Sequence, residues 1–392
     1  MTSSPITYFM AHSPLHEAAA MQSLADLCAR RLATLSLTPA PHGASVSPGD
    51  EVLLVLPISG GTEGLMKQLR DAWDRVGRRP VWVLAIPHHS SLAASLEFFA
   101  SLHNAGIPGR VFYFDPEAGD DDPGFRSIAG AVEALRANRV LHAARLGLIG
   151  MPSDWLLTSP PDAELVRTAW GPELAYIPVE ECLRALDAGR TMDQALRDLI
   201  AQHRLTALTL RCFDLLTARD ATACLALARL NDEGLPAGCE GDIPSALGLL
   251  WIHALWNEPG WMANPSRLDL RANRLTLAHC TVPFTLVSGH TVRTHFESGR
   301  GTAIAGHWTS DEVTVYRIGG PRLREWWIGQ GRVIERGQDE NLCRTQATVE
   351  FDDPDVLPAL LERPLGNHLL MIPGRRAAAL AAALAIRKQL NP

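Results

Sequence analysis

The sequence predicts an α/β protein in which two doubly wound parallel-sheet domains are followed by a β-rich, barrel-like carboxyl-terminal domain. Short apolar runs alternate with helical patterns over residues 1–150, and the same alternation returns at 174–260. From about residue 266, period-2 segments separated by glycine-rich turns replace it. Apolar runs alternating with helices are typical of buried parallel strands, whereas period-2 segments are typical of antiparallel strands. The expected domains are 1–155, 156–265 and 266–392.

The first domain is expected to bind a ligand at the carboxyl ends of its strands, as open α/β sheets do. The turn Ser59-Gly60-Gly61-Thr62-Glu63-Gly64 joins an apolar run to a helical pattern, and His88 follows the next run. Glycines permit close approach of a ligand, and a helix N-terminus attracts anions. Ser59, Thr62, Glu63 and His88 are therefore expected to contact a substrate, although the turn matches no nucleotide-binding fingerprint. The expected strands here are 51–57, 81–87, 111–114 and 146–150. One helix is expected to include 68–73, a second to run from Ser90-Ser91 to about 103, and a third to cover about 126–138.

In the second domain a strand is expected at 207–212, with Asp214 at its carboxyl end. A helix over 221–232 stops at Gly234, a favourable C-cap, and another helix begins after Asp242. The third domain ends in an alanine-rich helix over 375–390. Its expected strands are 274–280, 290–296, 302–308, 312–318, 325–335, 343–351 and 368–372.

Composition narrows the class of protein. The net charge of −7 and the absence of a basic block argue against nucleic acid as a partner. The N-terminus lacks a leader pattern, and no apolar run approaches the ~18 residues of a spanning helix, which argues against a membrane partner. Seven cysteines without a C-x-x-C pair predict a reduced cytoplasmic protein. A four-cysteine zinc site is an alternative that we rank below small buried thiols, and it would use Cys212, Cys239, Cys280 and Cys343.

Carboxylates and imidazoles gather between residues 239 and 368, as a divalent-metal site assembled from distant segments requires. Glu240 and Asp242 lie on a turn that opens a helix, where N–H groups favour ionised carboxylates. Asp242 is equally well explained as a helix cap, whereas Glu240 is not needed for capping. His368 follows a glycine at the start of a strand, which also favours a functional role.

Other polar residues in this region each have a structural alternative. His279 ends an apolar strand, where a lone histidine is often a core residue, and Asn264 could be a turn residue before Pro265. His295 and Glu297 alternate on one face of an expected strand. Arg344 and Gln346 alternate likewise, and they could bind hydroxyls or an anion or form surface pairs.

The order of these motifs resembles the L-fucose isomerase and L-arabinose isomerase superfamily. The segments that carry the resemblance are Cys239-Glu240-Gly241-Asp242, Trp261-Met262-Ala263-Asn264, His279-Cys280, His295 and Gly366-Asn367-His368. Glu240 stands where the fucose enzymes have Glu-Ala-Asp and the arabinose enzymes have Glu-Gly-Asp. His368 stands in the place of a Gly-Ala-Asn-His segment. The motifs cover about 200–392, and the preceding part resembles the family only in architecture.

The resemblance implies a metal-dependent aldose–ketose isomerase that acts through an enediolate, with Mn²⁺ or another divalent cation. It implies Glu240, Asn264, His295 and His368 as metal ligands, and a homo-oligomer, trimer or hexamer, that takes a small sugar. Glu240, Asp242 and Asp214 are the expected catalytic carboxylates, with Glu297 as a further possible base. The expected substrate contacts are His279, Glu297, Arg344, Gln346, His88, Ser59, Thr62 and Glu63.

Asn264 departs from the family pattern, because the fucose enzymes have a carboxylate at that place. The change lowers the negative charge of the site and removes one base. Two other functions therefore stay open, a catalytically silent sugar-binding relative and an epimerase or lyase that uses the same site. Neither the sugar nor the base is determined by the sequence.

Overall fold

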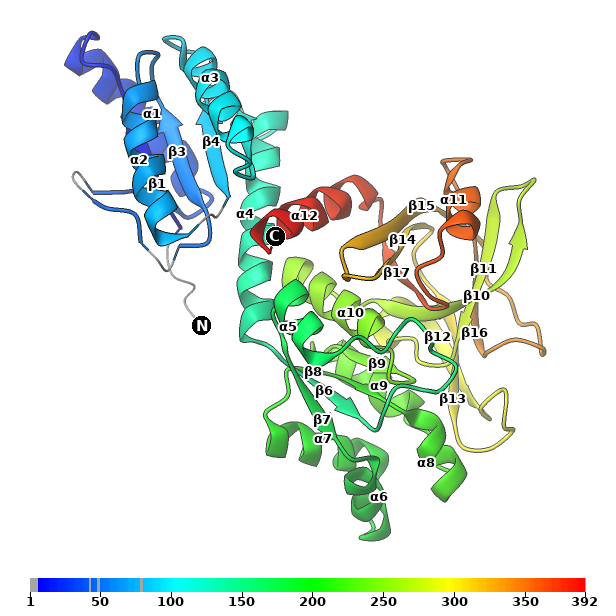
Figure 1. Cartoon of the computed structure of the whole chain (residues 1–392). Helices are drawn as coiled ribbons and strands as arrows, with labels where there is room; N and C mark the ends of the chain where they lie inside the picture. Colours follow the sequence, from blue (N-terminus) through cyan, green and yellow to red (C-terminus); the bar gives the residue numbers. More distant parts are fainter. Residues whose placement is uncertain (1–5, 42–43, 48–49, 78–79, 392) are drawn as a thin grey trace. The chain divides into compact units, whose positions relative to one another are not determined.

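The computed structural model describes residues 6–41, 44–47, 50–77 and 80–391. The chain forms two compact units, Met1–Arg136 with Ala382–Pro392, and Ala137–Ala381 (Figure 1). The expectation that the N-terminus lacks a leader pattern rests partly on residues 1–5, which lie outside the described residues. Within the described residues, no helix is long and apolar enough to cross a membrane.

The first unit contains a five-stranded parallel sheet with the strand order β2-β1-β3-β4-β5. Every residue of β3 and β4 is buried, because helices cover the strands, and Trp73 and Phe98 pack on their side chains. The order reverses between β1 and β3, which is the doubly wound topology that the sequence predicts. The strands are β1 (Ile6–Ala11), β2 (Leu37–Pro39), β3 (Leu53–Pro57), β4 (Val81–Ala85) and β5 (Gly109–Tyr113), and the helices are α1 (Ala18–Ala33), α2 (Glu63–Val76), α3 (Ser91–Asn104) and α4 (Pro123–Ala143), the last of which runs into the second unit.

The second unit begins with a four-stranded parallel sheet in the order β7-β6-β8-β9. The expected strand 207–212 ends at Leu210, because Cys212 already begins a helix, and the expected helix 221–232 begins at Cys224. The strands are β6 (Arg145–Ile149), β7 (Glu173–Ile177), β8 (Ala207–Leu210) and β9 (Ala237–Cys239), and the helices are α5 (Ala163–Trp170), α6 (Val179–Asp187), α7 (Met192–His203), α8 (Cys212–Arg219), α9 (Cys224–Asp232) and α10 (Ile243–Trp256).

A closed antiparallel barrel follows in the same unit, with the order β10-β11-β16-β15-β14-β17. The ring closes because β17 pairs with both β10 and β14. The predicted fold class, two parallel sheets and a barrel-like β-rich region, is therefore confirmed. The barrel strands are β10 (Trp261–Asp269), β11 (Arg274–His279), β14 (Glu312–Gly319), β15 (Glu325–Glu335), β16 (Thr345–Phe351) and β17 (Leu369–Pro373), with helix α11 (Val356–Glu362). Helix α12 (Ala377–Leu390) begins in this unit, and its residues from Ala382 onward belong to the first unit.

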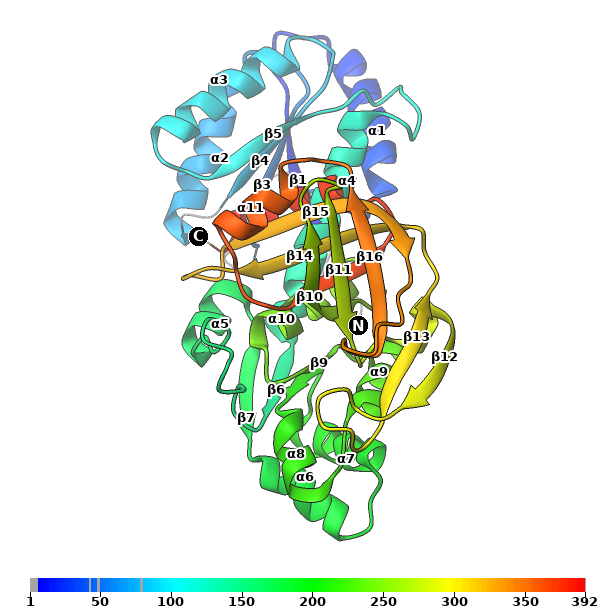
Figure 2. The same cartoon turned by 90° about the vertical axis from the view of Figure 1, so that its right-hand side faces the viewer.

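Two segments that resemble barrel strands in sequence form a separate hairpin. β12 (Val287–Arg293), preceded by the 3₁₀ turn η1 (Phe284–Leu286), pairs only with β13 (Ala303–Trp308) (Figure 2). β12 ends at Arg293, so the expectation that His295 and Glu297 share a strand face is wrong. Both residues lie in the turn between the two strands, where His295 N–H donates to the Arg300 carbonyl.

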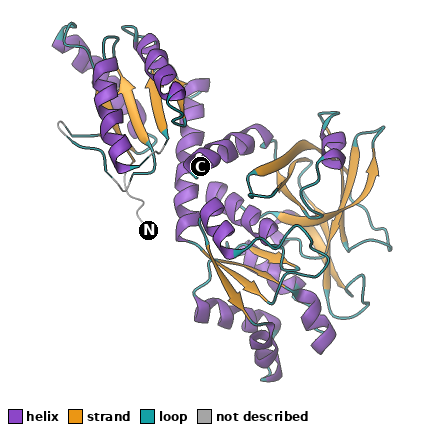
Figure 3. Ribbon diagram, viewed as in Figure 1, coloured by secondary structure: helices purple, strands orange, loops and turns teal. Residues whose placement is uncertain are grey.

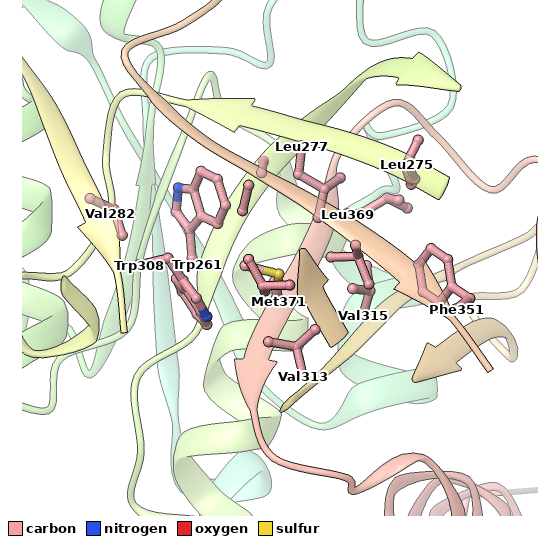
Figure 4. Close-up of a cluster of buried hydrophobic side chains, with 14 of the residues drawn as sticks. Trp261, Leu275, Leu277, Val282, Trp308, Val313, Val315, Phe351, Leu369 and Met371 are labelled. Carbon is pink, nitrogen blue, oxygen red and sulfur yellow. The ribbon is translucent and has the colours of Figure 1, made fainter. Parts of the chain in front are cut away.

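The barrel interior is apolar and well filled. Figure 4 shows Trp261 and Trp308 beside Leu277, Leu369 and Met371, all of them at most 1% exposed. Burial of each large apolar side chain contributes about 1.5–3 kcal/mol. The core therefore fixes the position of the last residue of β11, His279, and of the start of β17, which His368 directly precedes.

Helix α10 joins the parallel sheet to the barrel, because it packs on β8 and β9 and also on β14 and β17 (Figure 3). A Cβ at Gly248 would lie 2.3 Å from Leu370 Cδ1, so any other residue would require the buried Leu370 side chain to shift. Tyr316 donates its hydroxyl to the Gly248 carbonyl at 2.9 Å. This packing brings the turn before α10 to the start of β17.

Candidate functional site

Glu240 lies directly after β9 in a backbone conformation that residues other than glycine rarely adopt. Its φ is +62°, in the left-handed region, and Gly241 follows at +73°. A non-glycine residue there costs about 1–2 kcal/mol. Ser153 holds the conformation, because its N–H and its hydroxyl both donate to the Glu240 carbonyl, at 3.0 and 2.8 Å. Strain held in this way is typical of functional positions.

Asp242 is both a helix cap and a partner of two charged groups. Its Oδ1 accepts from the Ser245 N–H at 2.8 Å, which caps α10. Its Oδ2 accepts from Arg317 Nη1 at 3.0 Å and lies 2.8 Å from His368 Nδ1. Burial alone would raise the pKa of Asp242, but the Arg317 charge and the His368 hydrogen bond hold it well below its usual range. Asp242 therefore caps α10, as one interpretation of the sequence predicts, and its second oxygen also contacts Arg317 and His368.

Three side chains converge on one point beside this cap. Glu240 Oε1 lies 3.4 Å from His368 Nε2 and 3.6 Å from His279 Nε2. His279 is the last residue of β11, and His368 directly precedes β17. One ligand atom from each residue lies within 4.8 Å of the other two, and all three residues are buried. We call Glu240, His279 and His368 the ligand triad.

The ligand triad fits a divalent metal ion. His368 Nε2 is buried and, among the described residues, has no hydrogen-bond partner. Two imidazole nitrogens with one carboxylate oxygen form a donor set suited to a divalent transition-metal ion. Each ring is oriented through its other nitrogen, His368 by Asp242 and His279 by Thr281 Oγ1 at 2.9 Å. Metal-binding histidines are usually held in this way.

Charge within the ligand triad is strongly coupled. Burial alone would raise the pKa of Glu240, but the nearby imidazoles of His279 and His368 hold it far below its usual range. Burial alone would lower the pKa of His368, but its hydrogen bond to Asp242 and the nearby Glu240 carboxylate raise it to about 9. The pKa of His279 is also raised to about 9, against burial, by neighbouring Cys280 and Glu240. Without metal, the triad is a carboxylate between two imidazolium groups at neutral pH.

Trp155 is a site residue that sequence reasoning missed. It lies in the loop after β6, and its indole Nε1 donates to Glu240 Oε2 at 2.8 Å. Its ring meets Phe213 edge-on at 4.9 Å, and Phe213 meets the His295 ring at 5.6 Å. The available signal was a tryptophan in the loop 150–162, which follows the carboxyl end of a strand. Arg317 was missed as well, because nothing local in β14 marks it as a partner of Asp242.

The turn between β12 and β13 lies close enough to the ligand triad to interact electrostatically. Burial, followed by the charge of His279, lowers the pKa of His295. Burial, followed by the charge of Glu240, raises the pKa of Glu297. His295, an expected metal ligand, is not part of the ligand triad, and its Nδ1 faces Ser298 Oγ at 3.3 Å. Among the described residues, Glu297 has no hydrogen-bond or ion-pair partner for its side chain.

Other predicted site residues are engaged in local contacts. Asn264 Oδ1 accepts from Asn367 Nδ2 at 3.4 Å, and Asp214 pairs with Arg211 at 2.8 Å. Arg344 donates to the Thr294 carbonyl at 2.9 Å and pairs with Glu340. Gln346 uses both ends of its amide to close the 339–346 turn. These contacts leave Gln346 with a structural role.

The remaining predicted contacts belong to the first unit, and none is part of the ligand triad. Ser59 and Thr62 are fully buried, and Ser59 Oγ accepts from the Ser13 N–H at 2.9 Å. Glu63 begins α2. His88 forms a second group of possible ligands with Asp115 and Glu117, of which Glu117 is exposed.

Four cysteines beside the site are free thiols that contact one another in two pairs. Cys212 Sγ lies 3.1 Å from Cys239 Sγ, and Cys224 Sγ lies 3.3 Å from Cys280 Sγ. Within the described part of the chain, no group of three or more possible metal ligands includes a cysteine. The pairing favours buried thiols over the four-cysteine zinc alternative.

No family model matches the chain. Two curated proteins match part of it, and both are sugar isomerases by name. They are a sulfoquinovose isomerase of Alkalicoccus urumqiensis, 24% identical over 185 residues, and a sulfoquinovose isomerase of Clostridium sp. (strain MSTE9), 30% identical over 139 residues. The matches cover 45% and 34% of this chain but only 42% and 31% of the relatives.

Proposed function

We propose that this protein is a metal-dependent aldose–ketose isomerase. The observation that carries the proposal is the convergence of Glu240 Oε1, His279 Nε2 and His368 Nε2 at a buried point, where His368 Nε2 has no hydrogen-bond partner among the described residues. The two sugar isomerases that match part of the chain support the reaction class. Mn²⁺, a homo-oligomer (trimer or hexamer) and a cytoplasmic location belong to the same proposal.

The ligand triad would hold the ion, and Asp242 and Thr281 would orient its two imidazoles. A divalent ion bound there would polarise the sugar carbonyl and stabilise the enediolate as it forms. The burial of the triad limits water, so that charged groups act there more strongly than they do in bulk solvent.

The reaction also needs a base that moves a proton between C2 and C1, and we assign Glu297 to this role. Asp242 is fully buried and paired with Arg317, and Asp214 is paired with Arg211. Both oxygens of Glu240 face nitrogen groups. Glu297 retains a free carboxylate among the described residues, and burial and the charge of Glu240 raise its pKa, which makes the carboxylate a stronger base.

The proton balance is simple. The Glu297 carboxylate would take the C2 proton of an open-chain aldose, and its conjugate acid would return a proton to C1. The hydroxyl proton on O2 would move to O1, so the sugar is rearranged without any net oxidation.

An anionic sugar is the substrate that we propose. Both relatives are named for sulfoquinovose, a sulfonated sugar. Arg344 lies close enough to His295 to lower its pKa, although burial, His279 and Glu240 have larger effects on that pKa. Its guanidinium is a suitable partner for a sulfonate, because planar N–H donors pair with such oxygens.

The experiment begins with metal-free protein. We expect it to take up one Mn²⁺ per chain and then to convert an aldose, with sulfoquinovose in the panel, to its ketose. Glu240→Gln and His368→Ala should lose both properties. The matched controls are Glu350→Gln and His203→Ala. They change the same residue types, in ion pairs that lie outside the ligand triad.

Three outcomes would contradict the proposal. Absence of both metal binding and turnover would remove the isomerase function and leave a sugar-binding relative. Deuterium exchange at C2 without ketose release would identify an epimerase. Equal turnover in Glu240→Gln and wild type would show that the ligand triad is not the active site.

A further inference from the structure

The loop after β6 directs three hydrogen bonds to a single residue. The Ser153 N–H and hydroxyl donate to the Glu240 carbonyl, and the Trp155 indole N–H donates to its carboxylate. The first two hold the left-handed backbone of Glu240. The third acts on the side chain, which is the part that would bind metal.

The Trp155 hydrogen bond distinguishes the two carboxylate oxygens. Oε2 accepts from Trp155, whereas Oε1 faces His279 and His368. A carboxylate held at one oxygen presents the other in a fixed direction, which favours binding to a metal through one oxygen only. Groups that orient a metal ligand in this way contribute to metal affinity although they do not touch the ion.

The other side of Trp155 is open. The residue is 50% exposed, although a tryptophan at a purely structural position is usually buried. The Phe213 ring stands nearly perpendicular to the indole, with the ring centroids 4.9 Å apart, and the indole N–H donates to Glu240. An exposed indole face next to a metal ligand can receive the C–H face of a sugar ring, since both surfaces are apolar and flat.

We propose that Trp155 positions Glu240 for metal binding and that its exposed indole face contacts the sugar. The inference rests on the proposed function, because it concerns the same site. Trp155 is a positioning residue toward the metal and a specificity-determining residue toward the substrate.

Two substitutions separate the two roles. Trp155→Phe keeps an aromatic face but removes the N–H donor, whereas Trp155→Ala removes both. Leu157→Ala, two residues further along the same loop and 85% exposed in the wild-type protein, is the matched control. Because Trp155 is half exposed, both variants are expected to fold, and circular dichroism and thermal unfolding confirm this before any titration.

The first measurement is calorimetric titration of metal-free protein with Mn²⁺ alone. We expect Trp155→Phe to raise the Kd about 10–100-fold, which is the usual effect of losing an orienting partner of a ligand. Leu157→Ala should leave the Kd within about twofold. If Trp155→Phe also leaves it within twofold, the positioning role is wrong. If wild-type protein binds no Mn²⁺, the proposed function itself fails.

The second measurement compares KM and kcat at saturating Mn²⁺. We expect Trp155→Ala to raise KM about threefold to tenfold above Trp155→Phe, because only the alanine variant lacks an aromatic face. The fluorescence of Trp155 is the difference between wild type and Trp155→Phe, and sugar binding should quench this part. Equal KM values in the two variants, or unchanged fluorescence, would overturn the substrate contact.

Discussion

The Nδ1 atom of His368 lies 2.8 Å from Oδ2 of Asp242, and this contact turns Nε2 of the same ring toward Glu240 Oε1 at 3.4 Å. The other oxygen of Asp242 caps α10. One carboxylate therefore links the start of a helix in the α/β layer to a histidine at the mouth of the barrel. The geometry of the ligand triad depends on both parts of the fold.

Asp242→Asn is predicted to weaken metal binding while it keeps the helix cap. Asparagine caps helices as well as aspartate does, so α10 should remain intact. The neutral amide orients His368 less strongly, and we expect the Kd for Mn²⁺ to rise about 10–100-fold. Isothermal titration calorimetry of the metal-free variant measures the change. An unchanged Kd would contradict the orienting role.

The same substitution should also destabilise the protein, because Arg317 would be left without its charge partner. Arg317 is 1% exposed, and breaking a buried pair costs about 3–5 kcal/mol. In Asp242→Asn/Arg317→Met the unpaired charge is gone, and stability should largely return. Urea unfolding of the three proteins measures this, and metal affinity should stay low in the double variant.

Metal affinity is predicted to rise with pH up to about 9. Because the pKa values of His279 and His368 are raised to about 9 in the metal-free protein, both rings must lose a proton before they bind metal. Mn²⁺ uptake at pH 7.5 should release protons, which calorimetry in buffers of different ionisation enthalpy detects. A Kd that is constant between pH 6 and 9 would contradict this.

Stability should change in the opposite direction in the metal-free protein. Both pKa values lie above the unfolded value of about 6.5, so the ion pairs contribute fully below pH 6.5. That contribution is lost as pH rises through about 9. Thermal unfolding of metal-free wild type against His368→Ala should show a difference that shrinks over this interval, and a growing difference would refute the assignment.

The sequence was sufficient for the parallel sheets, because buried strands and amphipathic helices have distinct periods. It located Glu240 and His368 because each lies where a turn meets an element of regular structure. It did not separate the β12–β13 hairpin from the barrel, since an isolated hairpin and a barrel strand share a period of two. It predicted His279 as a substrate contact and did not predict that its Nε2 lies beside Glu240 and His368, because the direction of a side chain at a strand end depends on packing between distant elements.

Glu297→Gln is predicted to lower kcat about 10²–10⁴-fold, the usual contribution of a general base. Metal affinity should stay within about twofold of wild type, because Glu297 is not part of the ligand triad. The raised pKa of Glu297, caused by burial and by Glu240, places the acidic limb of kcat above the usual glutamate range. Wild type at saturating Mn²⁺ should lose activity as pH falls through that limb, and Glu297→Gln should not.

Asp214→Asn is the matched comparison for this prediction, because Asp214, unlike Asp242, is an expected carboxylate for which no hydrogen bond to the ligand triad is found among the described residues. Its ion pair with Arg211 should make it dispensable for proton transfer. If Asp214→Asn loses kcat and Glu297→Gln does not, the base is Asp214 and our assignment is wrong.

Glu240→Gly is predicted to be more stable than Glu240→Ala, although both lack the metal ligand. At a φ of +62° alanine retains about 1–2 kcal/mol of backbone strain that glycine does not have. Glycine also loses about 0.4–1 kcal/mol through the greater freedom of its unfolded chain. The strain is the larger effect, so glycine should be favoured by roughly 0.5–1 kcal/mol. Urea unfolding of the two metal-free variants measures the difference.

The same two substitutions at Glu173, an exposed residue of β7, provide the control. In a regular strand Glu173→Ala should be more stable than Glu173→Gly. If alanine is favoured at both positions, Glu240 does not hold the strained conformation in solution.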